Sequence, residues 1–174
     1  MNNLSITPGK NNVGAYINNI DLKNLEQNQV DEIKNTLSQF GVIFIKNQKL
    51  DPEDYQNFAK SIGHPVVYPR LKGLDEKFPF INVIERKPED KNLSFGSSWL
   101  HQDTSYLAKD RPRYTMLMGI EITVGQGNTI FSSAGPIAVT RLEREKEMGI
   151  KSSESMEAEH EIVKTVKNKK TLYI

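Results

Sequence analysis

A histidine and an aspartate stand two residues apart, at His101 and Asp103, behind the only tryptophan of the chain, Trp99. Side chains alternate across a β-strand, so residues i and i+2 share one face, with Cα atoms roughly 6.6 Å apart. From that separation an imidazole and a carboxylate can bind one metal ion, with bonds of ~2.1 Å. We therefore expect the pair on one face of a strand, with Trp99 on the same face as a wall of the site.

The kind of metal follows from the donors that the chain offers. One more histidine would complete the two-histidine, one-carboxylate set of non-haem Fe(II) oxygenases, which leaves coordination positions open for a co-substrate and O2. Cysteine is absent, so thiolate metal sites, disulfides and cysteine nucleophiles are excluded. Two alternatives stay open: a surface histidine that the aspartate merely orients, and a zinc site with His64 or His160 as a further ligand.

Composition limits the partners and the location. A formal net charge of +1 gives no global reason to bind nucleic acid or an anionic membrane. No apolar run approaches the ~18 residues of a membrane span, and the N-terminus lacks a signal-peptide core. With 174 residues, no repeat and no low-complexity linker, we expect one domain over residues 1–174, in the cytoplasm, where proteins without disulfides are usual.

The N-terminal part predicts helices between short strands. Residues 14–22 are typical of a strand and turn, and the β-branched and aromatic run 41–46 predicts a buried strand. A helix between them is predicted by apolar residues at helical spacing, namely Val30, Ile33, Leu37 and Phe40. A second helix is predicted to begin at Asp51 and Pro52 and to end at Gly63. Its inner stripe comprises Tyr55, Phe58, Ala59 and Ile62.

The remainder of the chain predicts strands. Short apolar runs separated by Gly, Asn, Pro and Lys-rich turns occur at 80–85, 114–122, 128–133, 161–166 and 170–174. The last two predict a hairpin with Asn168 at its turn, whereas residues 139–149 predict a charged surface helix. Helices followed by strands favour a β-sandwich or barrel with helices outside. Because the hairpin ends on a bare apolar edge at Ile174, we expect the fold to be incomplete there.

The motifs around His101 resemble those of the Fe(II)/2-oxoglutarate dioxygenases of the taurine dioxygenase and 2,4-dichlorophenoxyacetate dioxygenase family. That family carries W-H-x-D, a proline-containing linker, a strand, a Gly-Gly-Asp-Thr-x-Phe turn and a later His-Pro-Val-Val-Arg-Thr-His segment. The resemblance runs in order along nearly the whole chain. It is carried by "LSITP", "GVIFIKNQ", "HPVVYP", "WLHQDTSY", "RPRYTMLMGIEI", "GQGNTIF" and "AEHEIVKTVKNKKTLYI".

The resemblance implies a fold and a set of site residues. The fold would be a double-stranded β-helix, mainly β with flanking helices. His101 and Asp103 would bind Fe(II), and Thr129 would help to hold a carboxylate of the co-substrate 2-oxoglutarate, with O2 as the oxidant. His64, Tyr68 and Tyr106 would line the substrate end, where a histidine and a tyrosine contact an anionic group in taurine-type members. Without the resemblance, Thr129 is an ordinary strand residue and the other three are packing or loop residues.

Several departures from the family pattern bear on activity. Leu100 intrudes between Trp99 and His101, and "GQGN" replaces Gly-Gly-Asp. The chain ends before the family's distal histidine ligand and before the arginine that clamps 2-oxoglutarate. His160 matches a histidine that does not bind the metal. The sequence therefore contains two of the three iron ligands that the resemblance implies.

Three functional hypotheses follow. The first is an Fe(II)- and 2-oxoglutarate-dependent dioxygenase that hydroxylates a small organic acid or sulfonate. The second is a truncated, non-catalytic member of the same family. The third, a zinc-binding protein or hydrolase, is disfavoured because no general base stands beside the motif. The expected partner is a small-molecule substrate, with self-association into a homo-oligomer left open.

Overall fold

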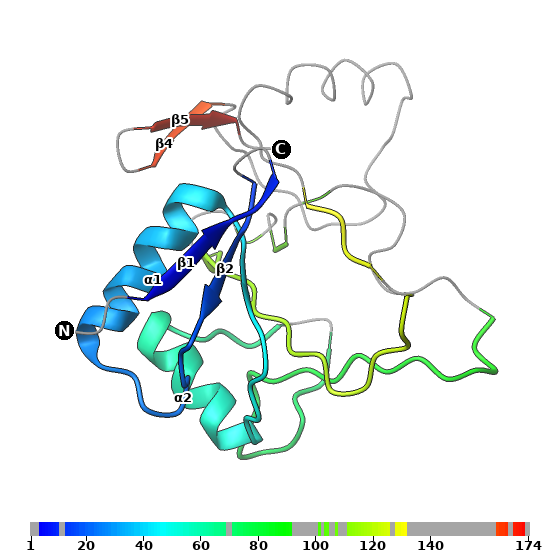
Figure 1. Cartoon of the computed structure of the whole chain (residues 1–174). Coiled ribbons are helices and arrows are strands. Elements are labelled where there is room, and N and C mark those ends of the chain that lie inside the picture. Colours follow the sequence, from blue (N-terminus) through cyan, green and yellow to red (C-terminus); the bar gives the residue numbers. More distant parts are fainter. Residues whose placement is uncertain are drawn as a thin grey trace, which may run out of the picture. The chain divides into compact units, whose positions relative to one another are not determined.

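The computed structural model describes residues 4–10, 13–68, 71–91, 101, 103–104, 107, 111–125 and 128–131, and the backbone of 163–166 and 169–172 (Figure 1). The chain divides into two compact units, Met1–Trp99 and Leu100–Ile174. The first unit holds most of the regular structure, and the second holds His101 and Asp103. The single domain expected over residues 1–174 stays a prediction.

The first unit is built on a small mixed sheet with the strand order β1-β2-β3. Strand β1 (Ser5–Pro8) pairs antiparallel with β2 (Ala15–Asn18), which pairs parallel with β3 (Ile43–Ile45). A parallel pair needs a long crossover, and helix α1 (Gln27–Phe40) provides it between β2 and β3. The predicted strands at 14–22 and 41–46 and the helix between them are thus confirmed, whereas β1 was not predicted.

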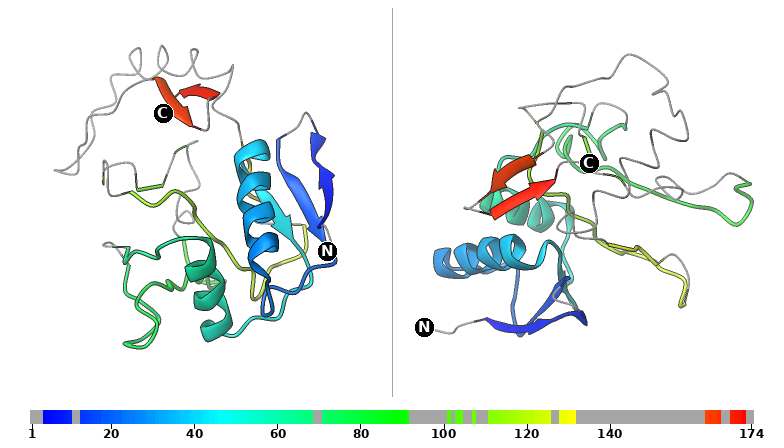
Figure 2. Two further views of the ribbon diagram at one scale, coloured as in Figure 1. Left: turned by 90° about the vertical axis from the view of Figure 1, so that its left-hand side faces the viewer. Right: turned by 90° about the horizontal axis from the view of Figure 1, so that it is seen from above.

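Helix α1 covers one face of this sheet (Figures 1 and 2). Ala15 and Ile17 of β2 and Ile33 of α1 are all buried. Three of the four positions of the predicted stripe, Val30, Ile33 and Phe40, are buried. The helix ends at Gly41, whose φ of 78° lies in the left-handed region that glycine adopts without strain.

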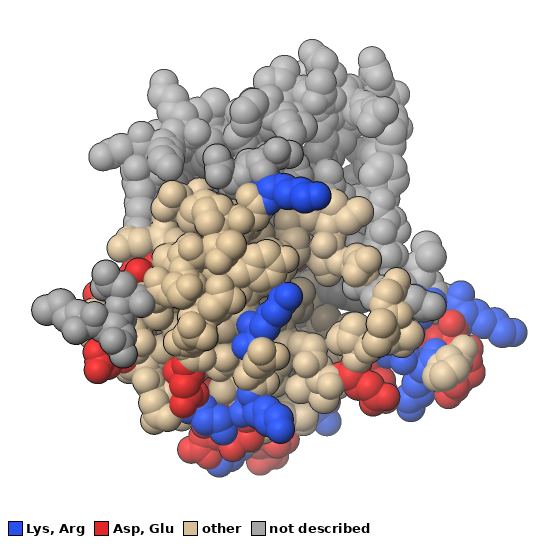
Figure 3. All heavy atoms as spheres, in the orientation of Figure 1, with Lys and Arg blue, Asp and Glu red and all other residues tan. Residues whose placement is uncertain are grey.

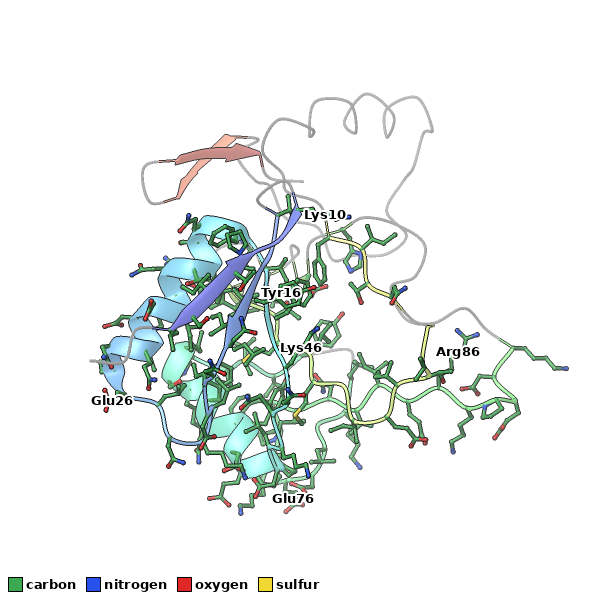
Figure 4. The ribbon with its side chains drawn as sticks, in the orientation of Figure 1. Lys10, Tyr16, Glu26, Lys46, Glu76 and Arg86 are labelled. Atoms are coloured by element: carbon green, nitrogen blue, oxygen red, sulfur yellow. The ribbon has the colours of Figure 1, made fainter. Side chains whose placement is uncertain are left out.

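The opposite face of the sheet carries an aromatic pair. Tyr16 and Phe44 lie side by side on β2 and β3 with ring centroids 5.2 Å apart, and Lys46 Nζ lies 5.0 Å above the Tyr16 ring (Figure 4). Figure 3 shows largely uncharged atoms over this face. The strand predicted at 41–46 forms but is less buried than predicted, because Phe44 is 36% exposed and Ile43 and Ile45 are half-buried.

Helix α2 (Pro52–Ile62) begins and ends where the sequence predicts. The Asp51 carboxylate accepts a hydrogen bond from the Asp54 amide at 2.8 Å, and the Asp54 carboxylate accepts one from the Asp51 amide at 3.3 Å. This reciprocal capping satisfies donors that the first turn leaves unpaired. At the other end the Gly63 amide donates to the Ala59 carbonyl at 3.0 Å. Phe58 and Ile62 form the buried face.

An ion pair joins α2 to the loop after β2. Lys23 Nζ lies 2.6 Å from Asp54 Oδ2. Hydrogen bonding to Asp54 raises the pKa of Lys23, and the same bond lowers the pKa of Asp54. The loop is also held by Gln48, whose side chain accepts from the Leu22 amide at 3.1 Å and donates to the Ile20 carbonyl at 2.9 Å. These contacts hold the loop after β2 against the segment after β3 and the start of α2.

The second unit contains a hairpin of β4 (Val163–Val166) and β5 (Lys169–Leu172). The strands pair antiparallel, with Val166 opposite Lys169, so two residues connect them and the predicted hairpin is confirmed. The strands predicted at 80–85 and 114–122 are not formed, and the described part of 128–133 is also outside any strand. Among the described residues, the segment 80–85 forms only one isolated β-bridge, between Asn82 and Gly73. The helix predicted at 139–149 lies outside the described residues.

The described residues therefore show both α and β structure but not a complete jelly roll. A strand pattern becomes a strand only when a neighbour supplies the other half of the hydrogen-bond ladder. No such neighbour is paired with 114–122 in the part of the chain that the structure describes. Within that part, no helix is both long and apolar enough to cross a membrane.

Candidate metal centre

The side chains of His101 and Asp103 meet. His101 Nε2 lies 3.2 Å from Asp103 Oδ1, and about half of each side chain is exposed, 50% and 45%. Two cis ligands bound at ~2.1 Å to one octahedral ion lie roughly 3.0 Å apart. The donor atoms thus have nearly the separation that two neighbouring ligands of one ion require. The same distance also suits an ion pair between a protonated imidazole and the carboxylate, which is the orienting role left open above.

A turn, rather than a strand, brings the two side chains together. His101 lies outside any strand, and Asp103 and Thr104 lie in a turn. Thr104 has φ 52°, and its carbonyl accepts a hydrogen bond from the Leu107 amide at 3.0 Å. The prediction that both residues lie on one face of a strand is therefore wrong. The close approach of their side chains, which it also predicted, is present. Trp99, expected on the same face, lies outside the described residues.

The chemistry of the pair fits a ferrous ion in part. Imidazole nitrogen and carboxylate oxygen are two of the three donors of the facial arrangement. Among the residues described here, no three His, Asp or Glu side chains come close enough to share an ion. His160, which the zinc alternative invokes, lies outside the described residues. The described residues therefore bring together two of the three donors that a facial metal site needs.

The other predicted residues fall in different parts of the chain. His64 is exposed directly after the end of α2, and Tyr68 is half-buried a few residues later, both in the first unit. Thr129 is exposed and outside any strand in the second unit. Tyr106 lies outside the described residues. The His101–Asp103 pair thus belongs to the second unit and the His64 segment to the first.

The structure adds one residue that the sequence does not single out, Thr104. Its side chain is only 8% exposed, and its Oγ1 has no hydrogen-bond partner among the described residues. A threonine after an aspartate is common, and its left-handed backbone is rare for a β-branched residue. No pattern in the sequence could therefore have identified it.

Comparison with protein families gives a match over most of the chain. A model of the "Taurine catabolism dioxygenase TauD, TfdA family" matches residues 5–148. An alpha-ketoglutarate-dependent sulfonate dioxygenase from Saccharomyces cerevisiae is 28% identical over 136 residues, 73% of this chain and 32% of the relative. An alpha-ketoglutarate-dependent sulfate ester dioxygenase from Pseudomonas putida is 25% identical over 132 residues, 75% of this chain and 42% of the relative. The chain thus spans less than half the length of either relative.

Solved structures give partial matches. A putative alpha-ketoglutarate-dependent taurine dioxygenase from Burkholderia xenovorans has 29% identity and a TM-score of 0.41, covering 44% of this chain and 28% of that protein. A taurine dioxygenase from the same organism has 25% identity and the same TM-score over the same shares of the two chains.

Proposed function

This chain belongs to the taurine catabolism dioxygenase TauD, TfdA family, and on that premise we propose that it acts as an Fe(II)- and 2-oxoglutarate-dependent dioxygenase. The substrate class is a small organic acid or sulfonate. The observation that carries the proposal is the 3.2 Å approach of His101 Nε2 to Asp103 Oδ1 within the range that matches the family. The relatives from yeast and Pseudomonas are named for sulfonates and sulfate esters, which both carry an anionic sulfur-oxygen group.

His101 and Asp103 would hold the ferrous ion in this account. When bound, Fe(II) and 2-oxoglutarate supply an oxidant from O2, as the co-substrate is decarboxylated to succinate and CO2 and the substrate is hydroxylated. The two side chains would supply one nitrogen and one oxygen, which are two of the three donors of the facial arrangement. For this role His101 would present an imidazole nitrogen to the ion.

The other predicted residues would bind the organic molecules. The Thr129 hydroxyl would donate a hydrogen bond to a carboxylate oxygen of 2-oxoglutarate, which orients the co-substrate. His64, Tyr68 and Tyr106 would recognise the anionic group of the substrate, as donors from an imidazole and phenols suit sulfonate or carboxylate oxygens. Both sets of contacts position the reactants rather than carry out the chemistry themselves.

Several broader features go with this function. Membership in the family supports a double-stranded β-helix with flanking helices as the architecture, to which the β1-β2-β3 sheet and the β4–β5 hairpin would contribute. We propose further that residues 1–174 act as one domain, that the partner is a small-molecule substrate, and that the protein works in the cytoplasm. Association into a homo-oligomer is left open.

A second candidate function is a non-catalytic member of the same family. It is favoured by the two-ligand site within the described residues. A site with only two protein ligands should bind iron weakly. The two candidates share ancestry and differ in turnover.

Succinate release separates the two candidates. The purified 174-residue chain would be loaded anaerobically with Fe(II) and 2-oxoglutarate and then exposed to O2 with taurine, an alkyl sulfate ester or an aryloxyacetate. We expect succinate that depends on both iron and 2-oxoglutarate and that disappears in His101→Ala. An Asp90→Ala variant, which removes an exposed carboxylate of the first unit, should release succinate as the wild type does. Release that is absent from the wild type establishes the non-catalytic alternative for this chain.

A further inference from the structure

Thr104 holds a backbone conformation that its side chain disfavours. Its φ of 52° lies in the left-handed region, and the hydrogen bond from the Leu107 amide to its carbonyl, 3.0 Å long, fixes it in the turn. For a β-branched residue this conformation is an outlier. Glycine adopts it freely and asparagine adopts it with less strain. Strained residues of this kind concentrate at ligand-binding and active sites.

The Thr104 hydroxyl is buried without a partner. The residue is 8% exposed, and no hydrogen bond to Oγ1 exists among the described residues. Folded proteins pair nearly all of their buried polar groups, because an unsatisfied buried hydroxyl is destabilising. Because no described residue pairs with it, the hydroxyl is available to a molecule bound beside it. The hydroxyl suits an oxygen atom as partner, since it can both donate and accept.

Thr104 directly follows Asp103, whose Oδ1 lies 3.2 Å from His101 Nε2. The strained turn, the buried hydroxyl and the metal-ligand pair thus occupy four consecutive positions of the chain, 101–104. We propose that Thr104 is a positioning residue of the metal centre whose hydroxyl hydrogen-bonds an oxygen ligand of the bound ion. That oxygen belongs to a 2-oxoglutarate carboxylate or to a water molecule. This role rests on the proposed function.

The residue type argues against a purely local role. If the chain needed only a left-handed turn after Asp103, glycine or asparagine would form it with less strain. Threonine contributes a hydroxyl at that position and removes it from solvent. Because no described residue pairs with this buried hydroxyl, a ligand would complete its hydrogen bond.

Three variants of Thr104 separate the hydroxyl from the backbone. Thr104→Val keeps the shape and removes the hydroxyl, Thr104→Ser keeps the hydroxyl, and Thr104→Gly removes both the hydroxyl and the strain. For each variant, Fe(II) affinity would be measured anaerobically without co-substrate. The affinity of the iron-loaded protein for 2-oxoglutarate would then be followed by the visible absorption band of the Fe(II)–2-oxoglutarate chelate. Circular dichroism and thermal unfolding would verify that each variant is folded.

We expect Thr104→Val and Thr104→Gly to weaken one of the two affinities by about tenfold, the effect of losing one hydrogen bond to a charged or metal-bound oxygen. Thr104→Ser should stay within about twofold of the wild type. The glycine variant should be at least as stable as the wild type, so its loss of affinity cannot come from unfolding. Weaker 2-oxoglutarate binding assigns the oxygen to the co-substrate, and weaker Fe(II) binding alone assigns it to water.

Two results overturn this role for different reasons. If the valine and glycine variants bind both ligands as the wild type does, the hydroxyl has no ligand and the metal centre stands without it. If the wild type itself binds no Fe(II), the proposed function fails, and the role of Thr104 fails with it. The wild-type titration alone distinguishes the second result from the first.

Discussion

A helix of the first unit and a strand-like segment of the second differ in whether the structure predicted from their local sequence is formed. In the first unit, the apolar stripe of α1 is buried beside the sheet (Figure 2), and Ile17 of β2 and Ile33 of α1 are 2% and 0% exposed. In the second, residues 114–124 alternate apolar and other side chains as a strand would, but no strand forms. Ile120 and Val124 there are 82% and 97% exposed. A helix satisfies its own backbone, whereas a strand depends on a neighbour, so the apolar stripe of α1 becomes a helix while the strand pattern at 114–122 forms no strand.

Hydrogen exchange should show the largest difference between the two units. The Ala15 amide donates to the Val42 carbonyl at 3.0 Å, and the α1 amides bond within the helix. Residues 114–124 make no backbone hydrogen bond within the described part of the chain. We expect amides of the first unit to exchange on the order of 10³-fold slower or more than those of 114–124. Mass spectrometry of peptic fragments measures this, and equal protection in both segments contradicts the comparison.

Truncating one buried and one exposed isoleucine tests the same difference between the two units. Ile33→Ala should lower the free energy of unfolding by about 2–5 kcal/mol, because it removes a fully buried side chain and leaves a cavity. The matched control Ile122→Ala should change it by less than about 0.5 kcal/mol, since that side chain is largely exposed. Urea unfolding followed by circular dichroism tests both variants. A large loss of unfolding free energy in Ile122→Ala would contradict this account.

A smaller effect is expected at the start of α2. Asp51→Ala removes the acceptor of the 2.8 Å bond from the Asp54 amide and should destabilise the first unit by about 0.5–2 kcal/mol. Asp51→Asn keeps an acceptor and should retain most of the stability. Thermal unfolding of the two variants gives the comparison, and equal losses in both would show that charge, rather than capping, is what Asp51 contributes.

The smallest effect concerns the exposed pair of Lys23 and Asp54. The pKa of Asp54 is lowered by its bond to Lys23, so this stabilisation is present above the unfolded-state pKa of about 3.9 and is lost as pH falls through the folded value. The pKa of Lys23 is raised, so the same stabilisation is also lost as pH rises through its folded value. Salt should weaken it. Urea midpoints of wild type and Lys23→Met between pH 2 and 7 should converge at the acid end.

Much of the first unit could be predicted from the sequence, because its signals are local. Asp51 and Gly63 mark the ends of α2, and Val30 and Ile33 mark the buried face of α1. Strand β1 escaped prediction because "SITP" has neither a clear alternation nor a long apolar run. The pattern at 114–122 predicted a strand that the described residues do not form, since pairing is a property of two segments.

In the candidate site, too, features that depend on neighbouring residues could be predicted from the sequence, and features that depend on distant segments could not. The spacing of His101 and Asp103 indicated that their side chains would converge, and they do, at 3.2 Å. The backbone that achieves this is a turn at Thr104, which no propensity predicts for a β-branched residue. The assignments of Thr129, His64, Tyr68 and Tyr106 stay predictions, because they concern contacts with molecules or segments far along the chain.

Metal titration of an Asp103 variant tests the central claim most directly. Mn(II), a redox-stable substitute for Fe(II), would be titrated calorimetrically into the wild type, Asp103→Ala and the surface control Asp90→Ala. We predict one Mn(II) bound by the wild type and by Asp90→Ala, and an affinity at least about 100-fold weaker in Asp103→Ala, because losing a ligand exceeds the effect of losing a supporting hydrogen bond. Equal Mn(II) affinity in all three proteins would contradict the assignment of Asp103, with His101, as the metal-binding pair.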